Sequence, residues 1–169
     1  DTNFEQKLID LGIDKDGLNG SVSNTSIVSL TSLNVSSSTI KDLTGIKGFV
    51  GLTSLVCIDN QMSTLDLSQN LNLTSLNCSN NPKLEKLNLK NGNNTAFITA
   101  NLDFTNNPAL VCIMVDDSTY SNTYWTDKKE VFANYNVDCT PYTLIPDSNF
   151  EQKLIDLGID KGGINGKVD

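Results

Sequence analysis

The sequence of 169 residues contains no histidine and no arginine. Without histidine, the chain cannot form a Ser-His-Asp triad, a Cys-His nucleophile pair or a histidine metal site. The missing arginine and a net charge of −8, from 12 lysines and 20 acidic residues, argue against binding to nucleic acid, which relies on basic surfaces and bidentate arginine contacts. The sequence also lacks an apolar run of about 18 residues, so we expect no membrane span.

The acidic residues do not form a catalytic pair. Asp116 and Asp117 are adjacent in the sequence. Adjacent residues of a strand face opposite sides of a sheet, so the two carboxylates are poorly placed to act as an acid and a base on one substrate. We therefore expect no enzymatic activity and no cofactor.

The segment DKDGLNG at residues 14–20 is similar to a calcium-binding loop, with Asp14 and Asp16 as candidate ligands. An EF-hand needs an oxygen ligand at its fifth position and a glutamate at its twelfth, and these positions hold Leu18 and Thr25. Turn formation explains the segment better. We expect no metal site, with calcium binding at Asp14 and Asp16 as the alternative.

A long repeat spans the sequence. Residues 1–23 recur as residues 147–169, with 18 of 23 positions identical and no gap. A match of this length does not arise by chance, and it indicates a tandem array of modules about 146 residues long. The alternative is a single protein that uses the same helical cap at both ends.

Each copy of the long repeat opens with a sequence that predicts a short helix. Thr2 and Glu5 have the spacing of a capping box, in which the hydroxyl accepts a free N–H and the glutamate bonds back to the start of the helix. Phe4, Leu8 and Leu11 follow at helical spacing and form one apolar stripe. We expect this stripe to cover the open end of a hydrophobic core.

A shorter repeat, LxxLxLxxN with a period near 21 residues, fills the middle of the chain. Residues 52–72 and 73–94 align in register, and looser copies precede and follow them over residues 30–115. Residues alternating as L-x-L face one side of a short strand, and the asparagine turns the chain by bonding to backbone groups. Stacked coils of this kind bury one continuous core, which predicts a leucine-rich repeat solenoid.

The repeats resemble known bacterial proteins. Each 21-residue unit contains two L-x-L strands, which is similar to the bacterial leucine-rich repeat class called IRREKO. The string IPDSNFEQKLIDLGID at 145–160, followed in module order by LTSLNCSNN-type repeats, resembles secreted leucine-rich repeat proteins of Bacteroidetes, especially flavobacteria. The resemblance implies an extracellular or cell-surface location, with the signal and sorting sequences outside this segment.

The four cysteines fall into two pairs. Cys57 and Cys78 occupy the same inward position of adjacent coils, which favours two buried thiols over a disulfide. Cys112 and Cys139 bracket an aromatic-rich segment that departs from the repeat, and we predict a disulfide between them that closes a C-terminal cap. The similar flavobacterial proteins carry a cysteine pair and a tryptophan in matching places.

The predicted fold is mainly β: a leucine-rich repeat solenoid with a short N-terminal helical cap and a disulfide-closed C-terminal cap. The expected divisions are a module at 1–139 (cap 1–29, repeats 30–115, C-terminal cap 116–139), a proline-containing linker at 140–146 and the start of the next module at 147–169. Two prolines in seven residues predict a stiff connector.

Two functional hypotheses follow. The first is a structural or adhesive repeat module of a long surface protein or filament, whose partners are neighbouring copies of the module. The second is a recognition module that binds a surface protein or glycan through the outward residues of its strands. Candidate contact residues are Val56, Ile58, Asn77 and Asp103, and Ser118 is a candidate O-glycosylation site because Asp-Ser-Thr resembles the pattern that Bacteroidetes modify.

Overall fold

The computed structural model describes residues 1–139, 143–144, 147–161, 163–164 and 167–168. The chain divides into two compact units, residues 1–137 and 138–169, called unit 1 and unit 2 below. Within the described residues, no helix has the length and apolar character that crossing a bilayer requires.

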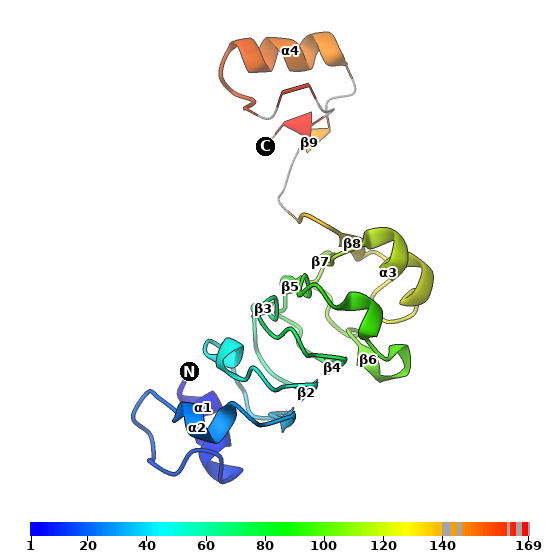
Figure 1. Ribbon diagram of the computed structural model, residues 1–169. Helices are drawn as coiled ribbons and strands as arrows, with labels where there is room; N and C mark the ends of the chain where they lie inside the picture. The colour runs from blue at the N-terminus through cyan, green and yellow to red at the C-terminus, as the bar shows by residue number, and fades with distance from the viewer. Residues whose placement is uncertain (140–142, 145–146, 162, 165–166, 169) are drawn as a thin grey trace. The chain divides into compact units, whose positions relative to one another are not determined.

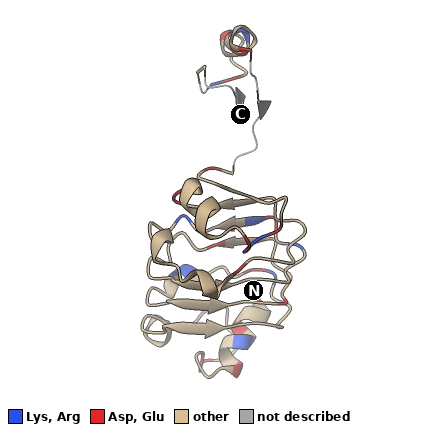
Figure 2. Cartoon of the chain, turned by 90° about the vertical axis from the view of Figure 1, so that its right-hand side faces the viewer, with Lys and Arg blue, Asp and Glu red and all other residues tan. Residues whose placement is uncertain are grey.

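Unit 1 contains two sheets in which every pair of neighbouring strands is parallel (Figures 1 and 2). Sheet A has the order β1-β2-β4-β6, and its strands are β1 (Ser32–Asn34), β2 (Ser54–Val56), β4 (Ser75–Asn77) and β6 (Leu102–Asp103). Sheet B has the order β3-β5-β7-β8, and its strands are β3 (Thr64–Asp66), β5 (Lys86–Asn88), β7 (Cys112–Met114) and β8 (Asn134–Asn136). The chain visits the two sheets in turn, once per repeat.

The strand register is the one that the repeat alignment predicts. In sheet A, the residues that lie side by side are Leu33, Leu55, Leu76 and Leu102. In sheet B, they are Leu65, Leu87, Ile113 and Tyr135. From Leu33 to Val115, every apolar residue that the pattern places inward is buried, and these residues form one core. The parallel sheets and the predicted strand register are therefore confirmed.

Buried asparagines hold the turns that follow the strands of sheet A. Asn81 donates from Nδ2 to the carbonyl of Cys78 in its own coil (2.9 Å) and to that of Cys57 in the preceding coil (3.1 Å). Asn107 bonds the carbonyls of Phe104 and Cys78 in the same way. These bonds confirm the role that the repeat pattern assigns to asparagine, and they also tie each coil to its neighbour.

The N-terminal helix α1 (Thr2–Asp10) begins differently from the prediction. Asp1 is the cap, and its Oδ1 accepts hydrogen bonds from the N–H groups of Asn3 (2.7 Å) and Phe4 (3.2 Å). The predicted capping box is wrong, because Glu5 does not bond back to the helix start. Its Oε1 accepts from the N–H groups of Asn19 (2.6 Å) and Gly20 (2.7 Å) instead, and these bonds hold the pKa of Glu5 below its ordinary value.

The helix covers the first end of the core as predicted, with one residue misplaced. Phe4 and Leu8 are buried, and the Phe4 ring lies 6.2 Å from the ring of Phe49. Leu11, predicted in the same stripe, is 45% exposed because the helix ends at Asp10. A second short helix, α2 (Asn24–Ile27), lies at the same end of unit 1 (Figure 1).

The other end of unit 1 carries the helix α3 (Ser118–Tyr124), which leads into Trp125 (Figure 1). Trp125 is fully buried, and the aromatic rings around its indole, at centroid distances of 5.6–6.5 Å, belong to Phe97, Phe104, Tyr120 and Tyr135. Two aromatic residues of the segment between Cys112 and Cys139, Tyr124 and Phe132, are exposed. Single-turn 3-10 helices occur at η1 (Ile46–Gly48), η2 (Asn94–Ala96) and η3 (Thr99–Asn101).

The predicted cysteine pairing is confirmed. Cys112 and Cys139 form a disulfide, and Cys57 and Cys78 are free and buried. Cys112 stands at the first, half-buried position of β7 beside the inward-facing Ile113, so the bridge lies outside the core.

Unit 2 consists of the helix α4 (Ser148–Asp156) and a two-stranded antiparallel ladder of β9 (Thr143–Leu144) and β10 (Lys167–Val168). Most of the predicted linker, residues 140–142 and 145–146 with both prolines, lies outside the described residues. The part that is described, β9, pairs with β10, so it belongs structurally to unit 2.

Candidate functional site

The outward side of sheet A is the face on which the sequence places candidate contact residues. We call this surface the first-strand face. Its rows run across the strands, and they consist of Ser32, Ser54 and Ser75; Asn34, Val56, Asn77 and Asp103; and Ser36, Ile58, Ser79 and Thr105. Charged residues are scattered over unit 1 and do not gather on this face (Figure 2).

The structure brings the four predicted contact residues together. Val56, Asn77 and Asp103 are register neighbours on β2, β4 and β6, so they form one continuous row. Ile58 lies in the next row, two residues after Val56. All four side chains are half-buried.

All three polar residues of the middle row close a turn. Asn77 accepts from the N–H of Ser79 (3.0 Å) and Asp103 from that of Thr105 (3.0 Å). Asn34 does the same for Ser36 (3.0 Å). The third residue of the strand thus bonds the backbone two residues on, which is an Asx turn. This role was not predicted from the sequence, although Asn or Asp at the same place in three of four coils is a visible signal.

These turns also change the expected exposure of one residue. Strand alternation places Ser79 on the same outward side as Asn77, but only 5% of its surface is exposed. Its hydroxyl donates to Asn77 Oδ1 (2.8 Å), so the side chain folds back against its own coil. The side chains of Asn77 and Asp103 are thus engaged in these turns. They also bond each other, with Asn77 Nδ2 donating to Asp103 Oδ2 at 3.5 Å.

Val56 departs from this rule. Its side chain cannot accept a hydrogen bond, so it cannot close the turn at Ile58. The N–H of Ile58 is bonded instead by Ser36 Oγ of the preceding coil, at 3.2 Å. The first-strand face therefore contains an apolar pair, Val56 and Ile58, within polar rows. The Ile58 N–H, which Val56 cannot bond, has its partner in the preceding coil.

A shallow hollow lies at the β6 end of the first-strand face. Its lining is polar and includes Ser75, Asn77, Asn101, Asp103, Asp127 and Lys128. Lys128 pairs with Asp127 at 3.4 Å, but Asp127 is 75% exposed, so this ion pair adds little stability. The hollow offers hydrogen-bonding groups to a polar partner.

The C-terminal cap closes the outer edge of sheet A without adding a strand to it. The N–H of Phe104 donates to the carbonyl of Lys128 (2.7 Å), and the N–H of Asn106 donates to Glu130 Oε1 (2.6 Å). An uncovered edge of this kind can pair with another chain. Docking by strand addition at β6 is thus blocked by the cap.

The buried cysteines carry no reactive site. Burial raises the pKa of the Cys57 thiol to about 12, and burial, followed by the nearby Cys57 and Asp103, raises that of Cys78 well above its ordinary value. Since the thiolate is the reactive form, both should remain thiols at mildly alkaline pH.

We expect iodoacetamide at mildly alkaline pH to leave Cys57 and Cys78 unmodified in the native chain and to modify both after unfolding in guanidinium chloride. The disulfide-bonded Cys112 and Cys139 serve as the internal reference, because without reductant they stay unmodified in either state. Peptide mass mapping gives the readout. Rapid labelling of Cys57 in the native chain would contradict the burial described above.

The loop with the candidate calcium ligands is organised as a turn. Asp14 is buried, and its Oδ1 accepts from the N–H of Asp16 at 3.0 Å, while Asp16 itself is exposed. Within the described part of the chain, no group of three or more His, Cys, Asp or Glu side chains is placed to hold a metal ion. The other predicted site residue, Ser118, is the half-buried first residue of α3, directly after the helix cap Asp117.

Part of the sequence is similar to a curated bacterial protein. It is 49% identical over 49 residues to Internalin J of Listeria monocytogenes serotype 4b (strain F2365), which is 29% of this chain and 5% of the relative. No protein-family model matches the sequence. Together with the repeat pattern, this similarity supports a protein of the leucine-rich repeat type.

The chain is also similar to a solved structure, the functional domain of InlJ from Listeria monocytogenes, which includes a cysteine ladder. The match covers 68% of this chain and 26% of the solved chain. The sequence identity is 33% and the TM-score is 0.41. The chain thus spans a small part of both proteins.

Proposed function

We propose that the chain is one module of a tandem array, followed by the beginning of the next module. The array belongs to a long cell-surface or secreted protein of the flavobacterial, IRREKO-like type, and the module serves there as a non-enzymatic structural or adhesive unit. Module 1 extends over 1–139 and ends in the disulfide-closed cap, residues 140–146 connect, and residues 147–169 open the next module.

The observation that carries this proposal is that the two copies of the long repeat form the same local structure. Asp147 caps α4 as Asp1 caps α1, since its Oδ1 accepts from the N–H groups of Asn149 (2.9 Å) and Phe150 (3.2 Å). Both helices are followed by a glycine in the left-handed conformation, Gly12 at φ +70° and Gly158 at φ +68°. A cap that repeats in both sequence and structure is the expected start of a new repeat array, because stacked repeats need their first end covered.

The cysteines support an extracellular location. A disulfide persists in oxidising compartments, and the bridge between Cys112 and Cys139 lies outside the core. The proposal can be tested by labelling intact cells of the source organism with an antibody against unit 1. We expect the antibody to label intact cells and a brief protease treatment to remove the labelling. Labelling seen only after permeabilisation would contradict the proposed location. Mass mapping of the native protein also tests whether Ser118 carries a glycan.

A second function, recognition of a protein or glycan, is favoured by the Val56–Ile58 pair. Sequences depart from their own local rules mainly where function requires it, and Val56 replaces the turn-closing Asn or Asp of the other coils. An apolar pair surrounded by polar groups is the usual arrangement of a small contact site. The partner proposed here is an exposed component of a cell envelope.

For this second function, we expect the double substitution Val56→Ser/Ile58→Ser to lower binding of the fluorescently labelled chain to intact bacterial cells at least about tenfold, since a few central apolar residues carry most of the binding energy. The matched control is Ile98→Ser/Val111→Ser, which removes two exposed aliphatic residues, 53% and 59% exposed, away from the first-strand face. Equal losses in both variants, or none in the first, would reject the pair as the contact site.

A further inference from the structure

The turns on the first-strand face fix two side chains and use only one end of each. Asn77 Oδ1 accepts from the N–H (3.0 Å) and the hydroxyl (2.8 Å) of Ser79. Asp103 Oδ1 accepts in the same way from the N–H (3.0 Å) and the hydroxyl (2.7 Å) of Thr105. The other polar atoms, Asn77 Nδ2 and Asp103 Oδ2, are held in position by these bonds without taking part in them.

These two remaining atoms lie side by side. Asn77 and Asp103 are register neighbours on β4 and β6, and the bond between Nδ2 and Oδ2, at 3.5 Å, is longer than the usual range for such a pair. Each atom can therefore take a closer partner. Because the turns already order both side chains, a ligand that bonds them pays little for their immobilisation. Together they form a preorganised donor and acceptor, called the polar pair below.

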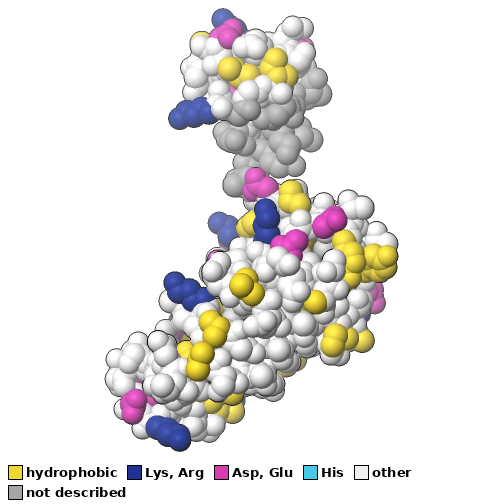
Figure 3. Space-filling view, viewed as in Figure 1, with side chains coloured by type: hydrophobic (Ala, Val, Ile, Leu, Met, Phe, Trp, Pro, Cys, Tyr) yellow, Lys and Arg dark blue, Asp and Glu magenta, His cyan; other side chains and the backbone are white. Residues whose placement is uncertain are grey.

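The polar pair belongs to the hollow at the β6 end of the first-strand face. This hollow of about 560 Å³ also includes the hydroxyls of Ser75 and Thr105 and the ion pair of Asp127 with Lys128. Figure 3 shows that most of the visible surface of unit 1 is neither charged nor hydrophobic and that its charged side chains are scattered. Since the single lysine of the hollow is paired and two carboxylates line it, the hollow does not attract anions.

The same row leads from the polar pair to the apolar pair. Val56 is the register neighbour of Asn77 on β2, about 4.8 Å away across the sheet, and Ile58 lies in the adjacent row. Both apolar side chains are half-buried and so remain partly accessible. A ligand laid along the row from Asp103 to Val56 thus meets hydrogen-bonding groups first and an aliphatic surface next.

The chemistry of a sugar matches this order. A hydroxyl both donates and accepts hydrogen bonds, so two neighbouring hydroxyls of one ring can bond Asn77 Nδ2 and Asp103 Oδ2 together. The C–H groups of the next ring are apolar and can pack on Val56 and Ile58. An acidic sugar is disfavoured, because its carboxylate would lie beside those of the hollow.

We propose that this part of the first-strand face binds a neutral oligosaccharide of two or more units. Asn77 and Asp103 bond adjacent hydroxyls of one unit in the hollow, and the next unit lies on Val56 and Ile58. The inference rests on the second function proposed above, recognition through the first-strand face, and it names the recognised envelope component as a glycan.

The sharpest variant is Asp103→Asn. Asn34 and Asn77 close the same turn with an amide oxygen, so the variant can keep the turn while Nδ2 takes the place of the acceptor Oδ2. The polar pair then presents two donors. We expect the affinity for the sugar to fall at least about tenfold, because a hydrogen bond to a charged acceptor is lost. Asn77→Asp makes the reverse change, presents two acceptors and should cause a similar loss.

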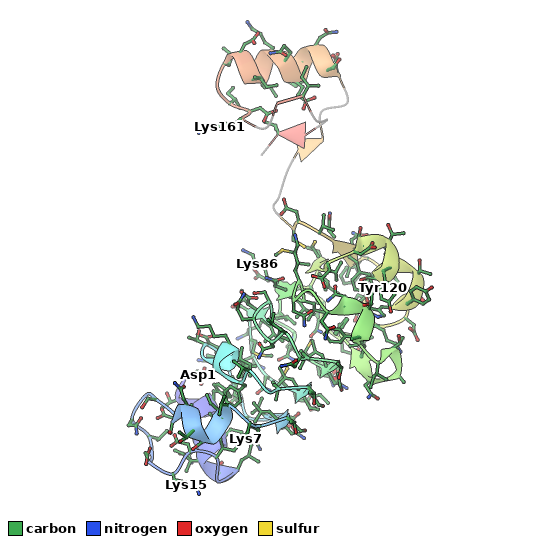
Figure 4. The ribbon with its side chains drawn as sticks, in the orientation of Figure 1. Asp1, Lys7, Lys15, Lys86, Tyr120 and Lys161 are labelled. Carbon is green, nitrogen blue, oxygen red and sulfur yellow. The ribbon has the colours of Figure 1, made fainter. Side chains whose placement is uncertain are left out.

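Sheet B provides matched controls. Asp66 and Asn88 close turns of the same kind, accepting from the N–H groups of Ser68 (3.0 Å) and Lys90 (3.0 Å). Lys86, which shares the outward side of β5 with Asn88, lies on the other side of unit 1 from β4 and β6 (Figures 1 and 4). Asp66→Asn and Asn88→Asp therefore make the same changes of atom and charge away from the hollow, and both should leave the affinity unchanged.

The probes are arrayed oligosaccharides of mannan, dextran, galactan and chitin, with those of alginate and hyaluronan as acidic counterparts. We expect the labelled chain to bind at least one neutral series and neither acidic one. The bound neutral probe is then titrated into the ¹⁵N-labelled chain, where the side-chain NH₂ signals of Asn77 should shift and those of Asn88 should not. This comparison needs no variant, and circular dichroism checks that each variant is folded.

Three results would overturn the proposal: no binding to any neutral probe, preference for the acidic probes, or equal losses in the sheet A and sheet B variants. The second function is tested separately by Val56→Ser/Ile58→Ser on intact cells. If that double substitution lowers cell binding while no arrayed sugar is bound, recognition through the first-strand face stands with a protein as its partner, and the sugar site is rejected.

Discussion

Replacing Trp125 by alanine should lower the free energy of unfolding of unit 1 by about 3–5 kcal/mol. The indole is fully buried and contacts aromatic rings from the last coils and from the C-terminal cap. Alanine would leave a cavity at the centre of this cluster, and the rigid coil stack can close such a cavity only in part. The loss is a large share of the total stability of a domain of this size.

Removal of the Trp125 side chain should also destabilise the C-terminal cap, because Trp125 positions a buried tyrosine. The Tyr135 hydroxyl donates to the Trp125 carbonyl at 2.9 Å, and desolvation, together with Asp127, raises the pKa of Tyr135. Tyr135 belongs to β8, the last strand of sheet B. Loss of packing at Trp125 should therefore loosen β8 and expose the end of the sheet.

Denaturant unfolding followed by circular dichroism measures this effect, and two variants control it. Trp125→Phe keeps an aromatic ring, and the indole N–H that it removes has no hydrogen-bond partner among the described residues, so its cost should be clearly smaller than that of alanine. Tyr124→Ala, at the adjacent but 56% exposed residue, should cost about 1 kcal/mol or less. Similar losses for Tyr124→Ala and Trp125→Ala would contradict the cluster as the centre of the cap.

Asn60→Ala should be similarly destabilising, by about 3–5 kcal/mol, because several buried backbone groups lose their partner at once. Asn60 is 1% exposed and links the first two coils. Its Oδ1 accepts from the N–H groups of Ser38 (3.2 Å) and Ile40 (3.0 Å), and its Nδ2 donates to the carbonyls of Val35 (3.0 Å) and Cys57 (3.2 Å). Unsatisfied buried groups cost more than the net value of the bonds that they lose.

The control for Asn60 is an exposed asparagine of the same repeat. Asn72 donates one bond, to the carbonyl of Val50 at 2.9 Å, and Asn72→Ala should cost no more than about 1 kcal/mol. The comparison uses the same unfolding measurement. A small effect at Asn60 would mean that water replaces the side chain inside the coil, and the asparagines would then not be what holds the stack together.

The sequence predicted the strand pairing correctly for a physical reason. Leucines that alternate along a strand must face one core, and a fixed period near 21 residues places each leucine beside its counterpart in the next coil. Leu55 and Leu76 therefore pair as aligned. The Cys112–Cys139 bridge was predictable because these cysteines flank the segment in which the repeat ends.

The errors concern contacts between residues that are distant in sequence. Thr2 and Glu5 have the spacing of a capping box, but Asp1 provides the cap, and Glu5 bonds a loop 14–15 residues further on. Local spacing cannot distinguish these partners, because both satisfy the same kind of backbone N–H. Leu11 was misplaced because the end of a short helix depends on the turn that follows it.

The sequence by itself determined the repeat, the inward and outward sides of each strand, the cysteine pairing and the candidate row of Val56, Asn77 and Asp103. Only the tertiary structure decided which of these row residues are committed to turns, because that depends on hydrogen bonds to backbone two residues on and in the neighbouring coil. It also assigned Thr143–Leu144 of the predicted linker to a strand of unit 2, through pairing with residues 167–168.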